Sequence, residues 1–143
     1  MKFIGVDIGS TGVRAIEVQP AAKGIEILRF IEHPLTLAQS QDPDIEIVDF
    51  LRTTFGKTDP QQTKFIFGLR QELLSTRIKS FPFREKPKIS KSLPFELEDE
   101  IPFDVDSAVL EGKILSFNGN TAEVMTSAVI KENVSRFLDK LRS

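Results

Sequence analysis

The sequence contains no cysteine, no tryptophan and no tyrosine, and its only histidine is His33. Without cysteine, neither a disulfide nor a thiolate metal site can form. A single imidazole also excludes a metal site built from several histidines. The 12 phenylalanines are the only large aromatic side chains, which favours core filling over a binding groove rich in polar aromatic groups.

Long apolar runs and an excess of positive charge are missing as well. No stretch approaches the roughly 20 apolar residues of a transmembrane helix, and Asp7 interrupts the apolar run that a signal peptide would need. We therefore expect contact with a membrane only through partners or through sequence missing from this chain. The formal net charge is -2 and the basic residues are scattered, so we predict no nucleic-acid partner.

The 143 residues suffice for one domain or two small ones packed together. Hydrophobic periodicity and turn signals predict the order βββαββ followed by αββα. The expected strands cover residues 3–8, 13–18, 25–31, 64–69, 75–81, 109–117 and 121–130, and the expected helices cover 45–55, 89–101 and 132–142. The first strand is apolar on both faces, which predicts a place in the middle of a sheet, antiparallel to the second strand.

Local signals mark the ends of these elements. Asp44 is the expected N-cap of the first helix, after a loop over residues 34–43. The pair Asn118-Gly119 predicts a hairpin turn, since both residues can adopt positive φ. Pro94 interrupts the apolar stripe of the second helix. It either kinks that helix or lies in its first turn with Ser92 as the cap, and the sequence leaves both interpretations open.

The most informative segment covers residues 5–14. Its glycines permit a tight turn with no Cβ near a ligand. Consecutive backbone amides could converge on an anion, and they belong to Gly9, Ser10, Thr11 and Gly12. Asp7 ends an expected central strand and could hold Mg²⁺ or a water bound to it. A plain β-hairpin, in which the glycines serve only the turn, explains the same residues equally well.

This segment resembles the first phosphate motif of the actin, sugar kinase and chaperone superfamily at Asp7, Gly9, Ser10 and Thr11. In that superfamily the hairpin opens subdomain 1A and holds the β- and γ-phosphates of ATP. The superfamily also needs a second Asp-x-Gly hairpin and a Gly-Gly adenosine motif, and the sequence contains neither. The resemblance therefore implies a partial or vestigial phosphate site, in which Asp7 would reach Mg²⁺ through water only when nucleotide is bound.

Residues 89–103 narrow the resemblance. They are similar to an acidic helix that ends in Ile-Pro-Phe. That helix belongs to the inserted 1C subdomain of one family of cytoplasmic actin-like domains, the family of the type II secretion L protein (GspL) and the type IV pilus M protein (PilM). The implied fold class is α/β (α+β), a truncated actin-like (ribonuclease H-like) fold. Its expected domains are a βββα meander, subdomain 1A, over residues 1–82, and a 1C-type αββ subdomain with a following helix over residues 83–143.

The resemblance also implies a function: a scaffold at the cytoplasmic face of the bacterial inner membrane. Such a scaffold couples a secretion or pilus ATPase to inner-membrane platform proteins by protein–protein binding, without catalysis, and a homodimer is left open. The alternatives are an ATP-binding hydrolase or kinase fragment that uses the Asp7 loop, and an α/β interaction domain whose loop binds nothing. We assign no catalytic residue and no cofactor to this chain, while ATP with Mg²⁺ stays open for a full-length protein.

An acidic run supplies the expected partner surface. Its residues are Phe95, Glu96, Glu98, Asp99, Glu100 and Phe103. The carboxylates would attract a basic partner, and the phenylalanines would anchor it. The competing interpretation is that both phenylalanines belong to the core and the acidic residues only keep the helix in water.

Overall fold

The computed structural model describes residues 1–36 and 42–142, and these form two compact units, Met1–Arg70 and Gln71–Ser143. The elements follow the predicted order, with two short 3₁₀ helices added. The expected loop over residues 34–43 lies partly outside the described residues, and its first residue, Pro34, is the last of a strand. No helix of the described part is both long enough and apolar enough to span a membrane.

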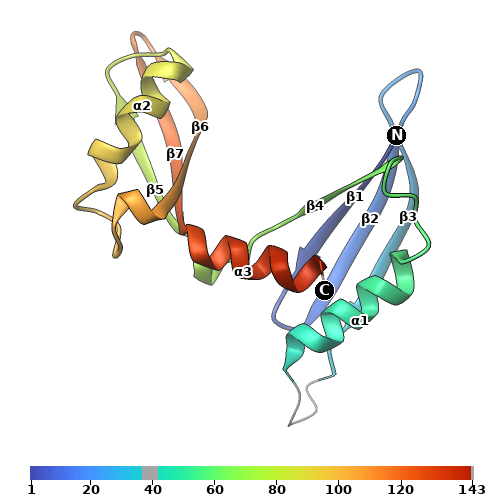
Figure 1. Ribbon diagram of the computed structural model, residues 1–143. Helices are drawn as coiled ribbons and strands as arrows, with labels where there is room; N and C mark the ends of the chain where they lie inside the picture. Colours follow the sequence, from blue (N-terminus) through green and yellow to red (C-terminus); the bar gives the residue numbers. More distant parts are fainter. Residues whose placement is uncertain (37–41, 143) are drawn as a thin grey trace. The chain divides into compact units, whose positions relative to one another are not determined.

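The first unit is a four-stranded sheet with one helix (Figure 1). Its elements are β1 (Lys2–Ile8), β2 (Gly12–Pro20), β3 (Ile25–Pro34), α1 (Pro43–Phe55) and β4 (Thr63–Phe67). The strands lie in the order β3-β2-β1-β4, with β1 antiparallel to β2 and parallel to β4. This confirms that the first strand is central and that it pairs antiparallel with the second.

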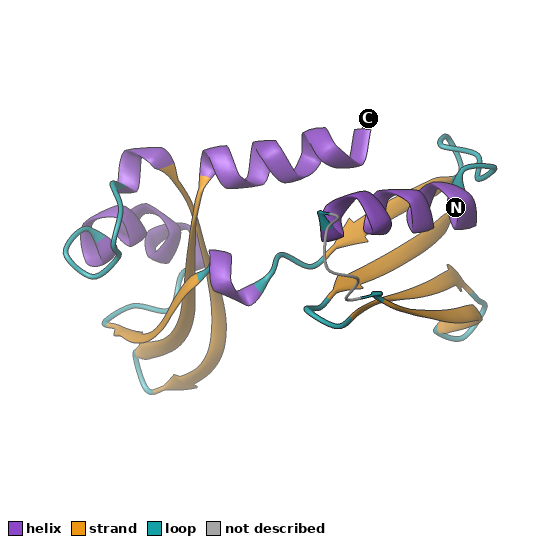
Figure 2. Ribbon diagram, turned by 90° about the horizontal axis from the view of Figure 1, so that it is seen from below, coloured by secondary structure: helices purple, strands orange, loops and turns teal. Residues whose placement is uncertain are grey.

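Helix α1 lies across one face of this sheet (Figure 2). Alternate residues of β1 point to that face, and Ile4, Val6 and Ile8 are buried there. From α1, Ile47, Leu51 and Phe55 recur every fourth residue and are buried. Each large aliphatic side chain buried in this way contributes about 1.5–3 kcal/mol.

The start of α1 differs from the sequence prediction. The N-cap is Asp42, whose side chain accepts a hydrogen bond of 3.0 Å from the Asp44 backbone amide, and Pro43 begins the helix. Proline suits the first helical position because the amide hydrogen that it lacks would have no partner there. Asp44, the expected cap, lies in the first turn, where its charge favours the helix dipole.

The second unit is a three-stranded sheet with two longer helices (Figure 1). Its elements are η1 (Gln71–Leu73), β5 (Ser75–Phe81), α2 (Lys86–Leu97), η2 (Val105–Ser107), β6 (Ala108–Asn118), β7 (Thr121–Ile130) and α3 (Lys131–Arg142). The order is β5-β7-β6 and both pairings are antiparallel. The boundary between the units lies at residues 70 and 71, ahead of the expected one after residue 82, because β5 pairs with β7.

Helix α2 supplies much of the core of this unit. Ile89, Leu93 and Leu97 are almost completely buried and pack in one cluster with Phe81 and residues of β6 and β7. Pro94 lies inside this helix, which decides between the two interpretations of that proline. Ser92 is not a cap, since its hydroxyl donates a hydrogen bond of 2.9 Å to the carbonyl of Lys88 one turn earlier.

The turn between β6 and β7 follows the prediction from its Asn-Gly pair. Gly119 has a φ of 57°, which glycine adopts without steric penalty. The two strands that it joins pair along their whole length, from Ala108 opposite Ile130 to Asn118 opposite Thr121. This hairpin is the platform on which α2 packs.

Candidate functional site

The candidate phosphate loop is the tip of the hairpin between β1 and β2, in the first unit. All five residues predicted for it therefore lie together. Ser10 and Thr11 are exposed at the tip, and Asp7 is exposed on β1 opposite Arg14 of β2. The amide of Gly9 donates a hydrogen bond of 2.9 Å to the carbonyl of Gly12. One of the four amides that could face an anion is therefore used within the hairpin itself.

The structure offers a reason for glycine in this loop that involves no ligand. The two glycines are Gly9 and Gly12. Neither has a positive φ. A Cβ at Gly12 would lie 2.9 Å from the backbone carbonyl oxygen of His33, so a side chain at that position would push β3 away from β2. This close approach is what the plain-hairpin interpretation requires, and it accounts for Gly12 before any phosphate is considered.

A shallow hollow lies beside this loop, on the sheet face away from α1. It has a volume of about 380 Å³, and its lining includes Asp7, Arg14, Ile16, Phe30, Ile66 and Gly68. Arg14 is tied to Glu32 of β3 by an ion pair of 2.9 Å. Phe30 and Ile66 are 62% and 58% exposed, so the floor of the hollow is apolar and open to solvent.

The groups predicted for a phosphate site are few. Asp7 is the carboxylate of the loop, and no cluster of three or more acidic or histidine side chains that could hold a metal ion occurs among the described residues. Asp7 would act on Mg²⁺ through water, and Ser10 and Thr11 would add hydroxyl donors to a phosphate. The Gly9 amide is committed to Gly12, so these groups do not complete a cradle.

The two phenylalanines predicted for the partner surface differ in environment. Phe95 lies on α2 and is 80% exposed, the largest exposed fraction of any large apolar side chain described. Phe103 follows the helix, is half-buried and packs against the core cluster of the second unit. The competing interpretation, that both belong to the core, therefore fits Phe103 and not Phe95.

The carboxylates of the predicted surface also fall into two groups. Lys79 of β5 lies 2.6 Å from the carboxylate of Glu100 and 3.5 Å from that of Glu96. The hydrogen bond to Glu100 is the main reason that the pKa of Lys79 is raised. Within the described residues Glu98 and Asp99 make no ion pair and are exposed. The charges available to a partner are therefore mainly those of Glu98 and Asp99.

The sequence did not predict that Lys79 pairs with these carboxylates, because nothing local in the sequence shows that β5 runs beside the end of α2. A lysine on a strand with the pattern of residues 75–81 reads as an ordinary solvent-facing charge. The ammonium group also donates a hydrogen bond of 2.8 Å to the carbonyl of Glu96, which helps to hold the last turn of α2 against the sheet.

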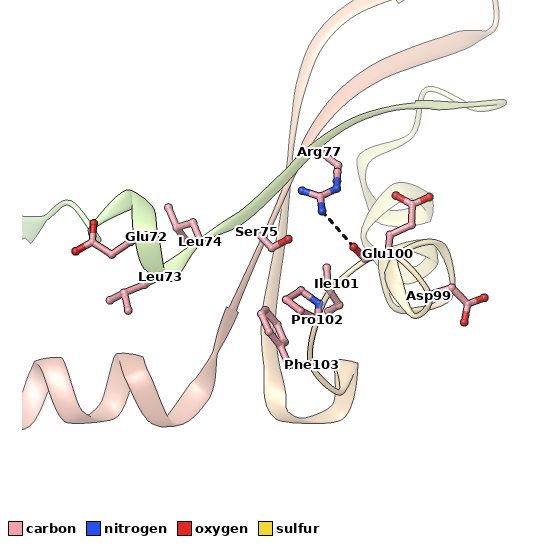
Figure 3. A pocket seen from close by; sticks show the side chains of 10 residues that line it. All are labelled: Glu72, Leu73, Leu74, Ser75, Arg77, Asp99, Glu100, Ile101, Pro102 and Phe103. Carbon is pink, nitrogen blue, oxygen red and sulfur yellow. Dashed lines mark hydrogen bonds between the residues drawn. The ribbon is translucent and has the colours of Figure 1, made fainter.

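Next to this surface, the second unit contains a pocket of about 420 Å³ (Figure 3). Its lining includes Leu73, Leu74 and Arg77 on one side, and Asp99, Glu100, Ile101, Pro102 and Phe103 on the other. Arg77 donates a hydrogen bond of 3.3 Å to the carbonyl of Glu100, drawn as the dashed line in Figure 3. The sequence prediction included Asp99, Glu100 and Phe103 and missed the residues of η1 and β5.

No protein-family model matches the chain, and no curated protein matches it. A chain of the PilM-PilN type IV pilus biogenesis complex is similar in structure, with a TM-score of 0.75 and 17% identity over 97% of this chain and 43% of that one. The cytoplasmic domain of EpsL, an inner membrane component of the type II secretion system of Vibrio cholerae, aligns with a TM-score of 0.56 and 20% identity over 99% of this chain and 52% of that one.

These likenesses concern the fold. They confirm the expected class, a mixed α/β chain, and show that it shares the fold of part of each of the two structures. The chain spans 43% and 52% of the lengths of the two structures, about half or less of each.

Proposed function

We propose that this chain is part of a scaffold component of a bacterial inner-membrane assembly platform, of the type II secretion or type IV pilus kind. It acts at the cytoplasmic face of that membrane by binding other proteins. Its partners are a secretion or pilus ATPase and inner-membrane platform proteins. The chain itself contributes no catalytic group.

The observation that carries the proposal is the structural likeness over 97% of this chain to a chain of the PilM-PilN type IV pilus biogenesis complex. A second likeness, over 99% of the chain, is to the cytoplasmic domain of an inner membrane component of a type II secretion system. One structure comes from a type IV pilus system and the other from a type II secretion system. These are the two kinds of system that the sequence motifs suggest.

The surface of α2 supports binding as the mode of action. Phe95 is held out in solvent at 80% exposure, although burying a phenylalanine is favourable by about 1.5–3 kcal/mol. Glu98 and Asp99 stand beside it and can attract a basic segment of a partner. Exposed aromatic side chains within a charged rim are typical anchors of protein interfaces.

The proposal is tested by measuring the affinity of this chain for the cognate ATPase N-terminal domain and for the cytoplasmic tail of the membrane partner. We expect Phe95→Ala to weaken binding by roughly tenfold or more, mainly by raising the off-rate. We expect Glu98→Lys with Asp99→Lys to slow association and to reduce its salt dependence. Calorimetry and surface plasmon resonance at two salt concentrations give both numbers.

The matched control is Glu111→Lys with Glu123→Lys, which makes the same change in charge at exposed positions of β6 and β7. Circular dichroism and urea unfolding check that each variant is folded. If the α2 variants bind both partners as the unmodified chain does, or if the control weakens binding equally, α2 is not the docking surface.

A further inference from the structure

The outward face of α2 carries an unusual order of charges. Ile89, Leu93 and Leu97 face the core, so the opposite side of the helix is the stripe Lys88, Lys91, Phe95 and Glu98. All four of these side chains are exposed. The stripe reads basic, basic, aromatic, acidic from the N-terminus to the C-terminus of the helix.

This order opposes the dipole of the helix. The N-terminal end of a helix carries partial positive charge and favours acidic residues, whereas the C-terminal end favours basic ones. Apart from Glu85 at its N-cap, α2 has no acidic residue in its first turn, and its last turn contains no basic residue. Lys86, Lys88 and Lys91 lie in the first half, and Glu96, Glu98 and Asp99 lie at the end. The pattern therefore does not serve the stability of the isolated helix.

We propose that this stripe is a self-association surface and that its occupant is α2 of a second copy of this chain. The second helix lies antiparallel on the stripe, across a two-fold axis that meets the outer face of α2 at the level of residue 93. The positions of the stripe are symmetric about residue 93. An antiparallel copy would bring Lys88 opposite Glu98 of the other chain, and Lys91 opposite Phe95 of the other chain. Each contact would occur twice, as a two-fold interface requires.

Every feature that is unfavourable in the single helix becomes favourable in this pair. The basic half of one helix lies on the acidic half of the other, and the two dipoles run in opposite directions. The methylene stem of Lys91 covers the Phe95 ring of the second copy, with the ammonium group over its face. Lys88 forms an exposed ion pair of 2.8 Å with Glu85, and such pairs are weak enough to rearrange.

The interface is small, and the association is correspondingly weak. Two short helices bury less than the roughly 1,000 Å² expected of a stable interface, so we expect dissociation constants on the order of 0.1–1 mM. Copies held together on one assembly reach effective concentrations in the millimolar range, where such contacts form between copies whose α2 is not occupied by another partner. This last step rests on the proposed function; the self-association itself does not.

Sedimentation equilibrium of the chain alone tests the inference. We expect the average mass to rise above the 16.1 kDa of the monomer as concentration approaches about 1 mM at low salt, and to rise less at high salt. Two variants make the stripe one sign throughout: Lys88→Glu with Lys91→Glu, and Glu98→Lys with Asp99→Lys. Each alone should associate at least about tenfold more weakly, and an equimolar mixture of the two should associate at least as well as the unmodified chain.

Ile78→Ser is the control, because Ile78 is 66% exposed on β5 of the same unit and should not matter. The inference is overturned if the unmodified chain stays monomeric up to about 1 mM, or if the single-sign variants associate like the unmodified chain. It is equally overturned if the mixture fails to recover association or if Ile78→Ser abolishes it. None of these measurements contains an ATPase or membrane tail, so their outcome is independent of the test of partner binding.

Discussion

Among single residues, Glu17 shows how a charged side chain stabilises the first unit. Its side chain is only 9% exposed, and its carboxylate pairs with Lys2 at 3.0 Å and with Arg29 at 2.6 Å. Arg29 in turn lies over the ring of Phe55, 5.1 Å from its centroid. The carboxylate on β2 therefore connects β1 and β3, and through Arg29 it reaches α1.

We predict that this connection makes stability depend on pH. The hydrogen bonds from Arg29, and then from Lys2, lower the pKa of Glu17 below its usual 4.5. The folded state thus favours the charged carboxylate. The resulting stability is fully present above about pH 4.5–5 and is lost as pH falls through the lowered pKa. Glu17→Gln should cost about 1–3 kcal/mol at pH 7 and clearly less near pH 3.

Urea unfolding of both proteins at the two pH values, followed by circular dichroism, measures this difference. Glu123→Gln on the exposed surface of β7 is the matched control and should change the free energy of unfolding little at either pH. The prediction is contradicted if the difference in free energy of unfolding between the unmodified chain and Glu17→Gln is equal at pH 7 and pH 3. The charge of Glu17 would then not be the source of that difference.

The two phenylalanines near the acidic run show that the type of a residue alone does not determine whether it is buried. Phe95 and Phe103 have the same side chain and lie in similar acidic surroundings in the sequence, yet one is 80% exposed and the other packs on the core. Position on the helix decides this. Phe95 falls on the side of α2 opposite Leu93, whereas Phe103 comes after the helix and turns back toward the sheet.

At the scale of elements, the sequence predicted the order of strands and helices because each has a clear local period. A short run that is apolar on both faces marked β1, and apolar residues at helical spacing marked α1 and α2. Element ends were less well predicted. The helix predicted over 89–101 begins earlier, at Lys86, and ends at Leu97. After Leu97 the backbone forms only single turns, in which the amides of Glu100 and Ile101 donate to the carbonyl of Leu97. These turns carry the apolar pattern on to Ile101 without extending the helix.

Pro94 gives a prediction at this scale. Inside a helix it removes one backbone hydrogen bond and crowds the preceding turn, which costs about 3 kcal/mol, partly offset by about 0.4–1 kcal/mol from the stiffer unfolded chain. We therefore expect Pro94→Ala to raise the free energy of unfolding by about 2 kcal/mol. Thermal and urea unfolding followed by circular dichroism measure the change.

Pro87→Ala is the control, since Pro87 lies in the first turn of α2, where proline is well tolerated. It should bring no gain in stability. If Pro94→Ala is neutral or destabilising, packing of the half-buried proline ring outweighs the missing hydrogen bond.

At the scale of the whole molecule, the sequence could not assign β5 to its sheet. The expected domain boundary after residue 82 placed residues 75–81 in the first domain. The strand instead pairs with β7, with Ser75 opposite Ala128, and no local pattern reports a partner so far along the chain. The ion pairs of Lys79 with Glu96 and Glu100 also depend on where β5 lies. The sequence could therefore identify the acidic residues near the end of α2, but not which of them lack an ion pair.

The phosphate loop was predictable as a location, because its residues are contiguous, but its capacity depends on the rest of the molecule. The loop offers the hydroxyls of Ser10 and Thr11 and the carboxylate of Asp7, all exposed. Charges in such a position are screened by salt over about 10 Å. The Gly9 amide is held by Gly12, and the sequence contains no second phosphate hairpin to oppose the first.

We therefore predict that this chain alone binds ATP with Mg²⁺ weakly or not at all, with a dissociation constant of roughly 1 mM or higher. Isothermal titration calorimetry measures this directly, and Ser10→Ala with Thr11→Ala is the comparison, because both side chains are exposed and their loss should leave the fold intact. Any heat that the double variant shares with the unmodified chain does not come from the loop. Micromolar affinity that disappears in the double variant would contradict the prediction, because a single hairpin would then be sufficient to hold the nucleotide.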